Sequence, residues 1–471
     1  MIAWETTRMC HLNCRHCRAA ASKSQHRDEL STAEGFRLIS EIAKFAKPLL
    51  ILTGGEPMAR PDIYELASRA TEKGFRVVMA TCGHLLTAET AEKIKASGIK
   101  ALSISLDGAD AAAHDKFRDT PGAFEKSLAG IQCARESGIP FQINTTVSRI
   151  NVRELPQILN LAEKIGASTM DFFFLVPTGR GKYLDDELLQ TEEYEESLRW
   201  IAEERSGRKI GVKTTCAPHF ARISQNTGCG CMAGGTFVFI SHRGIMQPCG
   251  FLDIPCGDLR KEGFNFEKLY RESEIFKSLR DPDRYEGKCG VCEFRNICGG
   301  CRARVYAANG DIMAADASCS HIPRTPEKDD GIPESLEEDL LLRLQQGIPL
   351  EKNPFSLMAA ELGIEEKQVI SFILKSFSEG KIRRLGAIFD GRKLGYMNTL
   401  CAASPAPGTE NEFIRRIRAL PGVTHCYERN WPEELESALP GSPAGKNYPN
   451  LWFTFGARAE NFNLEFAKIA E

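Results

Sequence analysis

Residues 1–17, MIAWETTRMCHLNCRHC, place three cysteines directly behind a short apolar run at residues 2–6. A short run that ends in a polar segment predicts a β-strand followed by a loop. Cys10, Cys14 and Cys17 have the spacing CxxxCxxC on that loop. Three thiolates on one loop can hold three irons of a 4Fe–4S cube and leave the fourth iron free to bind a small chelating molecule. A zinc site or a fully ligated ferredoxin site is the alternative, but zinc normally takes four ligands and no fourth cysteine lies nearby.

Five more apolar runs follow this loop and alternate with amphipathic stretches of helical length. Six βα repeats predict parallel strands joined by right-handed crossovers, and chemistry at the carboxyl ends of the strands. We therefore expect an α/β core over residues 1–205, a partial (β/α)6 barrel of the TIM type. The further strands are expected at residues 49–53, 76–81, 101–106, 141–146 and 171–176, and the helices at 32–45, 62–72, 87–96, 123–136 and 152–164.

Composition limits the classes of function. A chain of 471 residues with 42% apolar residues predicts about three domains with buried cores. The formal charge of −3 does not make nucleic acid the default partner. The sequence shows no apolar core of signal-peptide length and no membrane-spanning run, so we expect a cytoplasmic protein without a membrane partner. Fifteen of the seventeen cysteines lie between Cys10 and Cys319, and in a reducing compartment such clusters indicate metal or redox sites rather than disulfides.

Residues 206–320 are rich in glycine and cysteine and have few long periodic segments, which predicts a region folded around metal. The stretch KCGVCEFRNICGGC at residues 288–301 contains two CxxC pairs. A zinc ribbon built from these two pairs is one interpretation, because the spacing suits zinc. An auxiliary iron–sulfur site is the other.

The chain changes character after residue 320. Residues 321–334 contain Pro323, Pro326 and Pro333 among charges, which predicts a linker. Helices at 335–346, 354–362 and 365–379, then a strand pair at 382–389, predict a winged helix-turn-helix over residues 335–395. Residues 396–471 predict a ferredoxin-like α+β domain without its final strand. Its strands are expected at 396–402, 423–429 and 451–455, and its helices at 410–419 and 463–470.

The helix-turn-helix raises the alternative of a heme- or redox-sensing regulator that binds DNA. Its expected recognition helix opens with Glu365, Glu366 and Lys367. Acidic residues at this point would repel phosphate, so DNA is an unlikely partner and we expect an architectural role.

The cysteine loop, with the aromatic His16 before Cys17 and GGEP after the second strand, resembles the radical S-adenosylmethionine (SAM) superfamily. This resemblance implies that a reduced 4Fe–4S cluster cleaves SAM to a 5′-deoxyadenosyl radical, with an electron donor such as flavodoxin or ferredoxin. Where relatives often have TNG, this chain has Thr81, Cys82 and Gly83, and we interpret Cys82 as a buried thiol rather than a ligand. The residues that the resemblance assigns to SAM are Gly54, Gly55, Glu56, Pro57, Thr81 and Ser105.

The second cysteine field is similar to SPASM domains, which implies one or two auxiliary 4Fe–4S clusters. Cys298 and Cys301 are separated by two residues, where the familiar pattern has three. One expected ligand set is Cys289, Cys292, Cys298 and Cys319; a second would contain Cys231, Cys249 and Cys301. Cys216, Cys229 and Cys256 would complete the second set or are spare thiols.

Within the superfamily, residues 4–22, 175–181, 230–257 and 279–311 resemble the heme b synthases of the siroheme-dependent heme pathway. The resemblance implies oxidative decarboxylation of two propionates of iron coproporphyrin III to vinyl groups. Such a tetrapyrrole substrate needs cationic clamps, for which Arg180, Arg302 and Arg304 are candidates. The alternatives are another tetrapyrrole-modifying radical SAM enzyme and a peptide maturase. A maturase would be expected to carry a winged peptide-binding domain before Cys10.

Residues 379–400, 420–430 and 448–458 resemble siroheme decarboxylase subunits, which are related to Lrp/AsnC regulators. The resemblance implies a tetrapyrrole pocket and a second siroheme decarboxylase-like subunit as partner. Where that family often has a His-Gly pair, this chain has Phe455, Gly456 and Ala457, so we expect half of a heterodimer, a delivery module or a truncated remnant. The implied pocket residues are Arg383, Arg384, His425 and Tyr427.

Overall fold

The computed structural model describes residues 1–224, 230–324, 332–382, 385, 395–403, 409–419, 423–428, 451–458 and 460. The chain forms two compact units, Met1–Lys381 and Ile382–Glu471. Within the described residues no helix is both long and apolar enough to cross a membrane.

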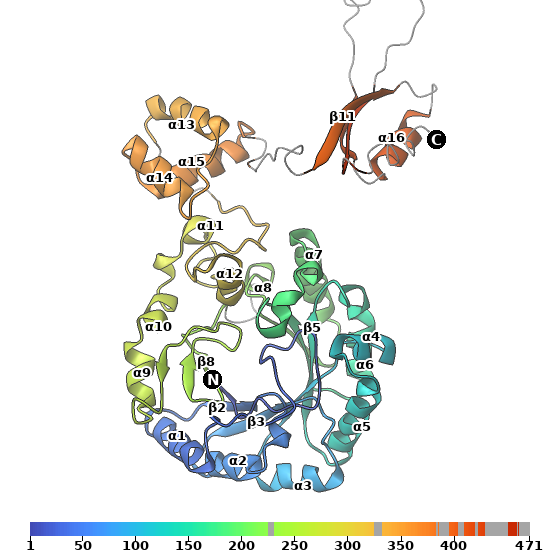
Figure 1. Ribbon diagram of the computed structural model, residues 1–471, viewed down its shortest axis with the longest axis vertical. Helices are drawn as coiled ribbons and strands as arrows, with labels where there is room; N and C mark the ends of the chain where they lie inside the picture. The colour runs from blue at the N-terminus through green and yellow to red at the C-terminus, as the bar shows by residue number, and fades with distance from the viewer. Residues whose placement is uncertain are drawn as a thin grey trace, which may run out of the picture. The chain divides into compact units, whose positions relative to one another are not determined.

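The first unit is built on a parallel sheet whose strands alternate with helices, as the sequence predicts. Strands β1 to β6 lie side by side in chain order, with every neighbouring pair parallel. The connecting helices run along the outer face of the sheet (Figure 1). The strands are β1 (Ile2–Glu5), β2 (Leu49–Thr53), β3 (Arg76–Thr81), β4 (Leu102–Ser105), β5 (Phe141–Val147) and β6 (Thr169–Phe174). The helices are α1 (Thr32–Phe45), α2 (Ile63–Glu72), α3 (Ala88–Ala96), α4 (Ala111–Arg118), α5 (Ala123–Glu136), α6 (Leu155–Lys164) and α7 (Thr191–Arg205).

The sheet continues beyond the six predicted strands at both edges. β7 (Gly211–Thr215) pairs with β6, and β8 (Val238–Ile240) pairs parallel with β1. β9 (Ile245–Gln247) and β10 (Gly257–Asp258) extend the β8 edge as antiparallel strands. β8 to β10 are only two or three residues long, and β7 (GVKTT) contains one apolar residue, so none of them has a hydrophobic pattern that predicts a strand. The ten strands form one sheet, and β8 to β10 thereby join the cysteine-rich segment to the barrel strands.

The two faces of the sheet differ because side chains alternate along each strand. In β4, Leu102 and Ile104 are buried in the apolar core, whereas Ser103 and Ser105 line a cavity on the inner face. β5 repeats this pattern, with Ile143 in the core and Asn144 on the cavity side. The inner face of the sheet therefore borders a cavity large enough for a ligand, where a complete TIM barrel would have a packed core.

The cysteine-rich segment has a small apolar core of its own. Val176, Leu252, Leu279 and Ile312 pack there with cysteines around them. Its helices are α8 (Phe220–Ile223), α9 (Phe266–Glu272), α10 (Glu274–Leu279), α11 (Gly287–Gly290) and α12 (Arg302–Asn309). A core of this size agrees with a region folded around metal.

The remaining elements follow the predicted order. Three helices occupy the helix-turn-helix region: α13 (Glu334–Gln346), α14 (Pro354–Leu362) and α15 (Glu366–Ser378). Among its described residues, the second unit contains an antiparallel sheet of order β11-β13-β12 and one helix, formed by β11 (Tyr396–Ala403), α16 (Glu410–Ala419), β12 (Val423–Glu428) and β13 (Leu451–Arg458). The strand pair expected at 382–389 lies almost entirely outside the described residues, and the helix expected at 463–470 does so completely.

Helix α5 approaches the loop after β3 at a glycine. A Cβ at Gly130 would lie 2.1 Å from the carbonyl oxygen of Gly83. We expect Gly130→Ala to lower the free energy of unfolding by about 1–3 kcal/mol, because the backbone must move to relieve the overlap. The measurement is the thermal midpoint of the anaerobic protein.

Gly207 provides the matched control, because a Cβ there meets no atom within 4 Å. Gly207→Ala should change stability by no more than about 0.5 kcal/mol. Equal losses in the two variants would contradict the close packing at Gly130.

Candidate active site

The loop between β1 and α1 brings Cys10, Cys14 and Cys17 into one cluster of packed side chains. Cys10 and Cys14 are each 7% exposed. The main-chain N–H groups of Leu12 and Ala21 donate to the sulfurs of Cys10 and Cys17, both at 3.4 Å. Burial raises the pKa of the Cys10 thiol to about 11, so binding of metal must displace its proton. Three clustered sulfurs, two of them buried and two of them accepting from main-chain N–H groups, suit an iron–sulfur cluster.

The GGEP segment lies directly against the chain that enters this loop. The N–H groups of Gly55 and Glu56 donate to the carbonyl oxygens of Thr7 and Met9, at 2.7 and 2.8 Å. A Cβ at Gly54 would lie 2.4 Å from the Thr7 oxygen, and one at Gly55 would lie 2.4 Å from the Met9 oxygen. Only glycine allows this approach, which fixes the two loops to each other.

Glu56 links this segment to the loop after β3. Its fully buried carboxylate accepts from the Thr81 hydroxyl at 2.8 Å and from the N–H of Cys82 at 2.9 Å. It also accepts from the N–H of Met58 at 3.1 Å, which caps the 3-10 turn that begins at Pro57. The Thr81 hydroxyl is therefore used to position Glu56, and of the six residues predicted to contact SAM it is Ser105 that lines the cavity.

A buried ion pair lies beside Cys14, and the sequence analysis missed it. Arg118, the last residue of α4, bonds Asp107 with 2.7 Å between Nε and Oδ2, and its Nη1 lies 3.6 Å from the Cys14 sulfur. Burial opposes ionisation of Asp107, but Arg118 and the nearby histidines hold its pKa below the usual value. The pair therefore places a fixed positive charge next to one of the three loop sulfurs.

One cavity of about 620 Å³ extends from the cysteine loop to the second cysteine field. Pockets for small molecules commonly measure about 300–1,000 Å³. His16, Arg118 and Ser105 line it on the side of the cysteine loop and the strand ends. Its other lining residues include four thiols, those of Cys216, Cys231, Cys249 and Cys301.

These four cysteines form one interacting group. Cys301 is buried in an apolar cluster against which Cys216, Cys231 and Cys249 pack, and the neighbouring Cys216 lowers the pKa of Cys301. Cys216 thus completes the group expected around Cys231, Cys249 and Cys301. Cys256 contacts the Ile254 carbonyl and packs on the main core instead, and Cys229 lies outside the described residues.

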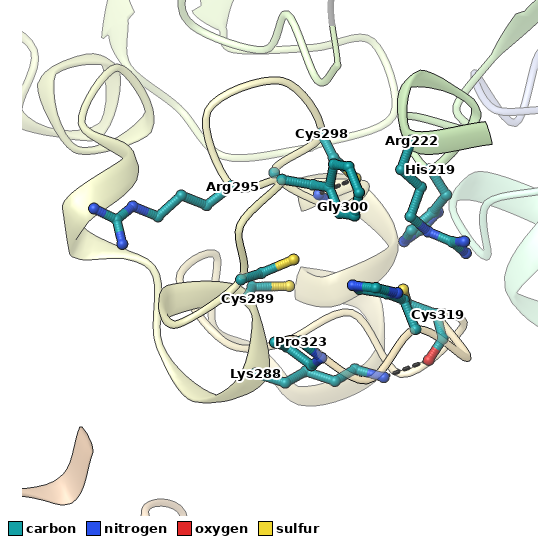
Figure 2. A pocket seen from close by; sticks show the side chains of 13 residues that line it. His219, Arg222, Lys288, Cys289, Arg295, Cys298, Gly300, Cys319 and Pro323 are labelled. Carbon is teal, nitrogen blue, oxygen red and sulfur yellow. Dashed lines mark hydrogen bonds between the residues drawn. The ribbon is translucent and has the colours of Figure 1, made fainter. Parts of the chain in front are cut away.

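The other four cysteines line a separate small pocket: Cys289, Cys292, Cys298 and Cys319. Figure 2 shows three of them by label, together with Lys288, which donates to the Cys319 carbonyl. The N–H of Gly300 donates to the Cys298 sulfur at 3.4 Å. This is the first auxiliary set expected from the sequence.

Two glycines explain how neighbouring cysteines reach different groups. Gly299 and Gly300 have φ values of +69° and +64°, in the left-handed region that favours glycine. The chain turns there and sends Cys298 to the small pocket and Cys301 to the large cavity. The two CxxC pairs therefore line different spaces, which disfavours a zinc ribbon built from both pairs.

The three arginines proposed as carboxylate clamps contact the protein main chain instead. Arg180 donates to the carbonyls of Cys14 and Ala21 at 2.8 and 2.9 Å. Arg302 donates to two carbonyls after α12, and Arg304 donates to the carbonyl of Cys216 at 2.9 Å. None of the three arginines lines the cavity. Their hydrogen bonds instead support segments of the chain that carry cysteines.

Four other cations line the cavity: Arg18, Arg118, Arg205 and Lys213. Arg18 pairs with Glu5, and Lys213 pairs with Asp171. The side chain of Arg205, at the end of α7, makes no hydrogen bond or ion pair with any residue that the structure describes. It had no sequence signal beyond its charge.

The predicted pocket residues of the second unit are not placed in detail. His425 and Tyr427 belong to β12, but their side chains lie outside the described part of the chain, as do Arg383 and Arg384 completely.

Three family descriptions match the chain. The radical SAM superfamily matches residues 4–162, the siroheme decarboxylase NirDL-like HTH domain matches 337–383, and the AsnC-like ligand binding domain matches 393–471.

Individual proteins match the first two thirds of the chain. An AdoMet-dependent heme synthase of Nitratidesulfovibrio vulgaris is 46% identical and is aligned over 69% of this chain and 93% of its own length. One from Methanosarcina barkeri is 44% identical, over 69% and 97%. The crystal structure of Streptococcus suis SuiB bound to S-adenosylmethionine matches with a TM-score of 0.56 at 16% identity, over 68% of this chain and 77% of that chain. It shows the same fold.

Replacement of Glu56 tests the loop arrangement. In Glu56→Gln the amide nitrogen cannot accept, so one of the three donors loses its partner. Loss of one hydrogen bond to a charged group costs about 1.5–3 kcal/mol, which predicts SAM binding weaker by about tenfold or more. Equilibrium dialysis with SAM measures this change, and Glu65→Gln on the exposed side of α2 is the control. Unchanged SAM affinity in Glu56→Gln would refute the positioning role.

Proposed function

Because this chain belongs to the AdoMet-dependent heme synthase family of the radical SAM superfamily, we propose that it oxidatively decarboxylates two propionates of iron coproporphyrin III to vinyl groups. The observation that carries this proposal is the single cavity lined both by the strand ends beside the SAM loop and by four cysteines of the second field. A reaction that removes a hydrogen atom and then an electron from one substrate needs a source of radicals and an electron acceptor at the same site.

Cys10, Cys14 and Cys17 would hold the first cluster, and the main chain of Gly54 to Pro57 with Ser105 would hold SAM. When bound, the cluster and SAM would supply radical chemistry for removing hydrogen from the β-carbon of a propionate. The protein's own part is to fix the geometry: Glu56 holds the SAM loop, and Arg118 keeps a positive charge beside Cys14.

We also propose two auxiliary clusters. One would be held by Cys216, Cys231, Cys249 and Cys301, and the other by Cys289, Cys292, Cys298 and Cys319. A cluster at the first set would accept the electron that leaves the substrate as carbon dioxide is lost. Arg304 and Arg302 support these sets through the Cys216 carbonyl and the Cys289 sulfur. The initial electron would come from a flavodoxin or ferredoxin.

Arg205 is our candidate for binding a substrate carboxylate. Its side chain lines the cavity without a described protein partner, whereas Lys213 of β7, which also lines the cavity, is paired with Asp171. A guanidinium can bind a carboxylate through two hydrogen bonds. Coproporphyrin has two propionates that do not react, and one of them would bind here.

For the C-terminal module we propose a tetrapyrrole-handling role in the cytoplasm, together with a second siroheme decarboxylase-like subunit. Its support is the match of residues 337–383 and 393–471 to the NirDL-like and AsnC-like domains. The acidic start of α15, at Glu365 and Glu366, disfavours DNA as the partner.

Anaerobic incubation with SAM, a strong reductant and iron coproporphyrin III tests the reaction. We expect two successive losses of about 46 mass units, each one carbon dioxide and two hydrogens, with formation of deoxyadenosine. Mass spectrometry of the tetrapyrrole is the measurement. Deoxyadenosine formed while the tetrapyrrole stays unchanged would contradict the proposed substrate.

The Arg205→Gln variant tests the carboxylate anchor. We expect KM for the tetrapyrrole to rise about tenfold, because a charged hydrogen bond to the carboxylate is lost, while the affinity for SAM stays the same. Arg199→Gln is the control, since Arg199 is an exposed arginine of the same helix. Equal KM values in the two variants would exclude Arg205 as the anchor.

A further inference from the structure

A group of three metal-ligating side chains lies next to the first cysteine loop and has no role in the proposed reaction. His11 belongs to that loop, and Cys82 and His84 follow β3. The distance from His11 Nε2 to His84 Nδ1 is 3.0 Å, and the Cys82 sulfur lies 3.8 Å from His11 Nε2. All three potential ligand atoms lie within 4.8 Å of one another.

The hydrogen bonding of His84 leaves its other nitrogen available. His84 Nε2 lies 3.0 Å from the carbonyl oxygen of Ala123, which can only accept, so Nε2 carries the proton. Nδ1 then carries a lone pair and lies 3.0 Å from His11 Nε2 and within 4.8 Å of the Cys82 sulfur. A ring N–H bound to a main-chain carbonyl is the usual arrangement of a histidine that ligates metal.

The main chain around the group is fixed. The N–H of Cys82 donates to Glu56, and its carbonyl accepts from the Ser127 hydroxyl at 3.1 Å. Lys23 donates to the carbonyl of His11. Ligands held by such outer contacts need little rearrangement to bind an ion.

The distances suit a tetrahedral ion. Zinc bonds of about 2.0 Å to nitrogen and 2.3 Å to sulfur place neighbouring ligand atoms roughly 3.3–3.6 Å apart. The spacings of 3.0 and 3.8 Å differ from this by a few tenths of an ångström. Two nitrogens and one sulfur favour zinc over magnesium or calcium, which prefer oxygen.

We propose that His11, Cys82 and His84 form a mononuclear zinc site with a fourth position open to water. Cys82, which the sequence suggested was only a buried thiol, is then a ligand. A zinc ion here would connect the cysteine loop to the loop that carries Thr81, whose hydroxyl positions Glu56. Its role would be to hold these two loops together.

A second group, His26, Asp28 and His242, is weaker as a site. Arg243 binds the Asp28 carboxylate at 2.6 Å, and His242 Nδ1 is bonded to Glu5 at 2.8 Å. An ion would have to displace Arg243. This group therefore supplies a matched control.

The test uses the full chain with its iron–sulfur clusters, stripped of loose metal by dialysis against a chelator and then equilibrated with Zn²⁺ under anaerobic conditions. We expect the parent protein to bind one more zinc ion per chain, tightly, than the His84→Gln variant. Zinc X-ray absorption should show two nitrogen neighbours and one sulfur neighbour around this ion. Cys82→Ser should lose the sulfur neighbour and bind zinc at least tenfold more weakly. His26→Gln should retain the zinc, and iron content should be the same in all variants.

Equal zinc content in the parent protein and in His84→Gln would overturn the proposal. Four sulfur neighbours around the zinc would also overturn it, because the ion would then occupy a cysteine set. Loss of iron together with zinc in His84→Gln would assign the histidine to support of the cluster loop instead.

Discussion

The site depends on the hydrogen bonds that the buried carboxylate of Glu56 accepts. This carboxylate joins the turn after β2 to Thr81 and Cys82 after β3, while the glycines before it press against the main chain that leads to Cys10. Three segments distant in sequence are thereby held at the same end of the sheet. A buried charge needs this many donors, and removing them would leave it uncompensated.

The inner face of the sheet provides the second constraint. Polar and small residues such as Ser105 and Asn144 face inward, so the barrel keeps a cavity where a complete barrel would be filled. The cysteine-rich segment continues the same sheet through β8 and contributes four thiols to the cavity. The turn at Gly299 and Gly300 separates the remaining sulfurs into their own pocket. The four residues from Cys298 to Cys301 thus contribute sulfurs to two separate groups of cysteines.

Local pattern was sufficient to predict much of this arrangement. The strands β1 to β6 and the helices α1, α2, α3, α5 and α6 follow from hydrophobic periodicity, and the spacing of Cys10, Cys14 and Cys17 places them on one loop. Long-range geometry was not predictable. Cys216 and Cys301 are far apart in the sequence and come together only in the folded chain. Arg118 was not identified because helix α4 was not predicted. Arg180, Arg302 and Arg304 were interpreted from charge alone, but each donates to at least one main-chain carbonyl and none of them lines the cavity.

The central claim is that the first three cysteines hold a cluster with one corner free for SAM. Electron paramagnetic resonance of the reduced protein, recorded with and without SAM, tests it most directly. The account predicts that SAM alters the signal of one cluster and that this alteration disappears when Cys10, Cys14 and Cys17 are all replaced by serine, while signals from other clusters persist. A spectrum that SAM leaves unchanged, or a SAM effect that survives the triple replacement, would contradict it.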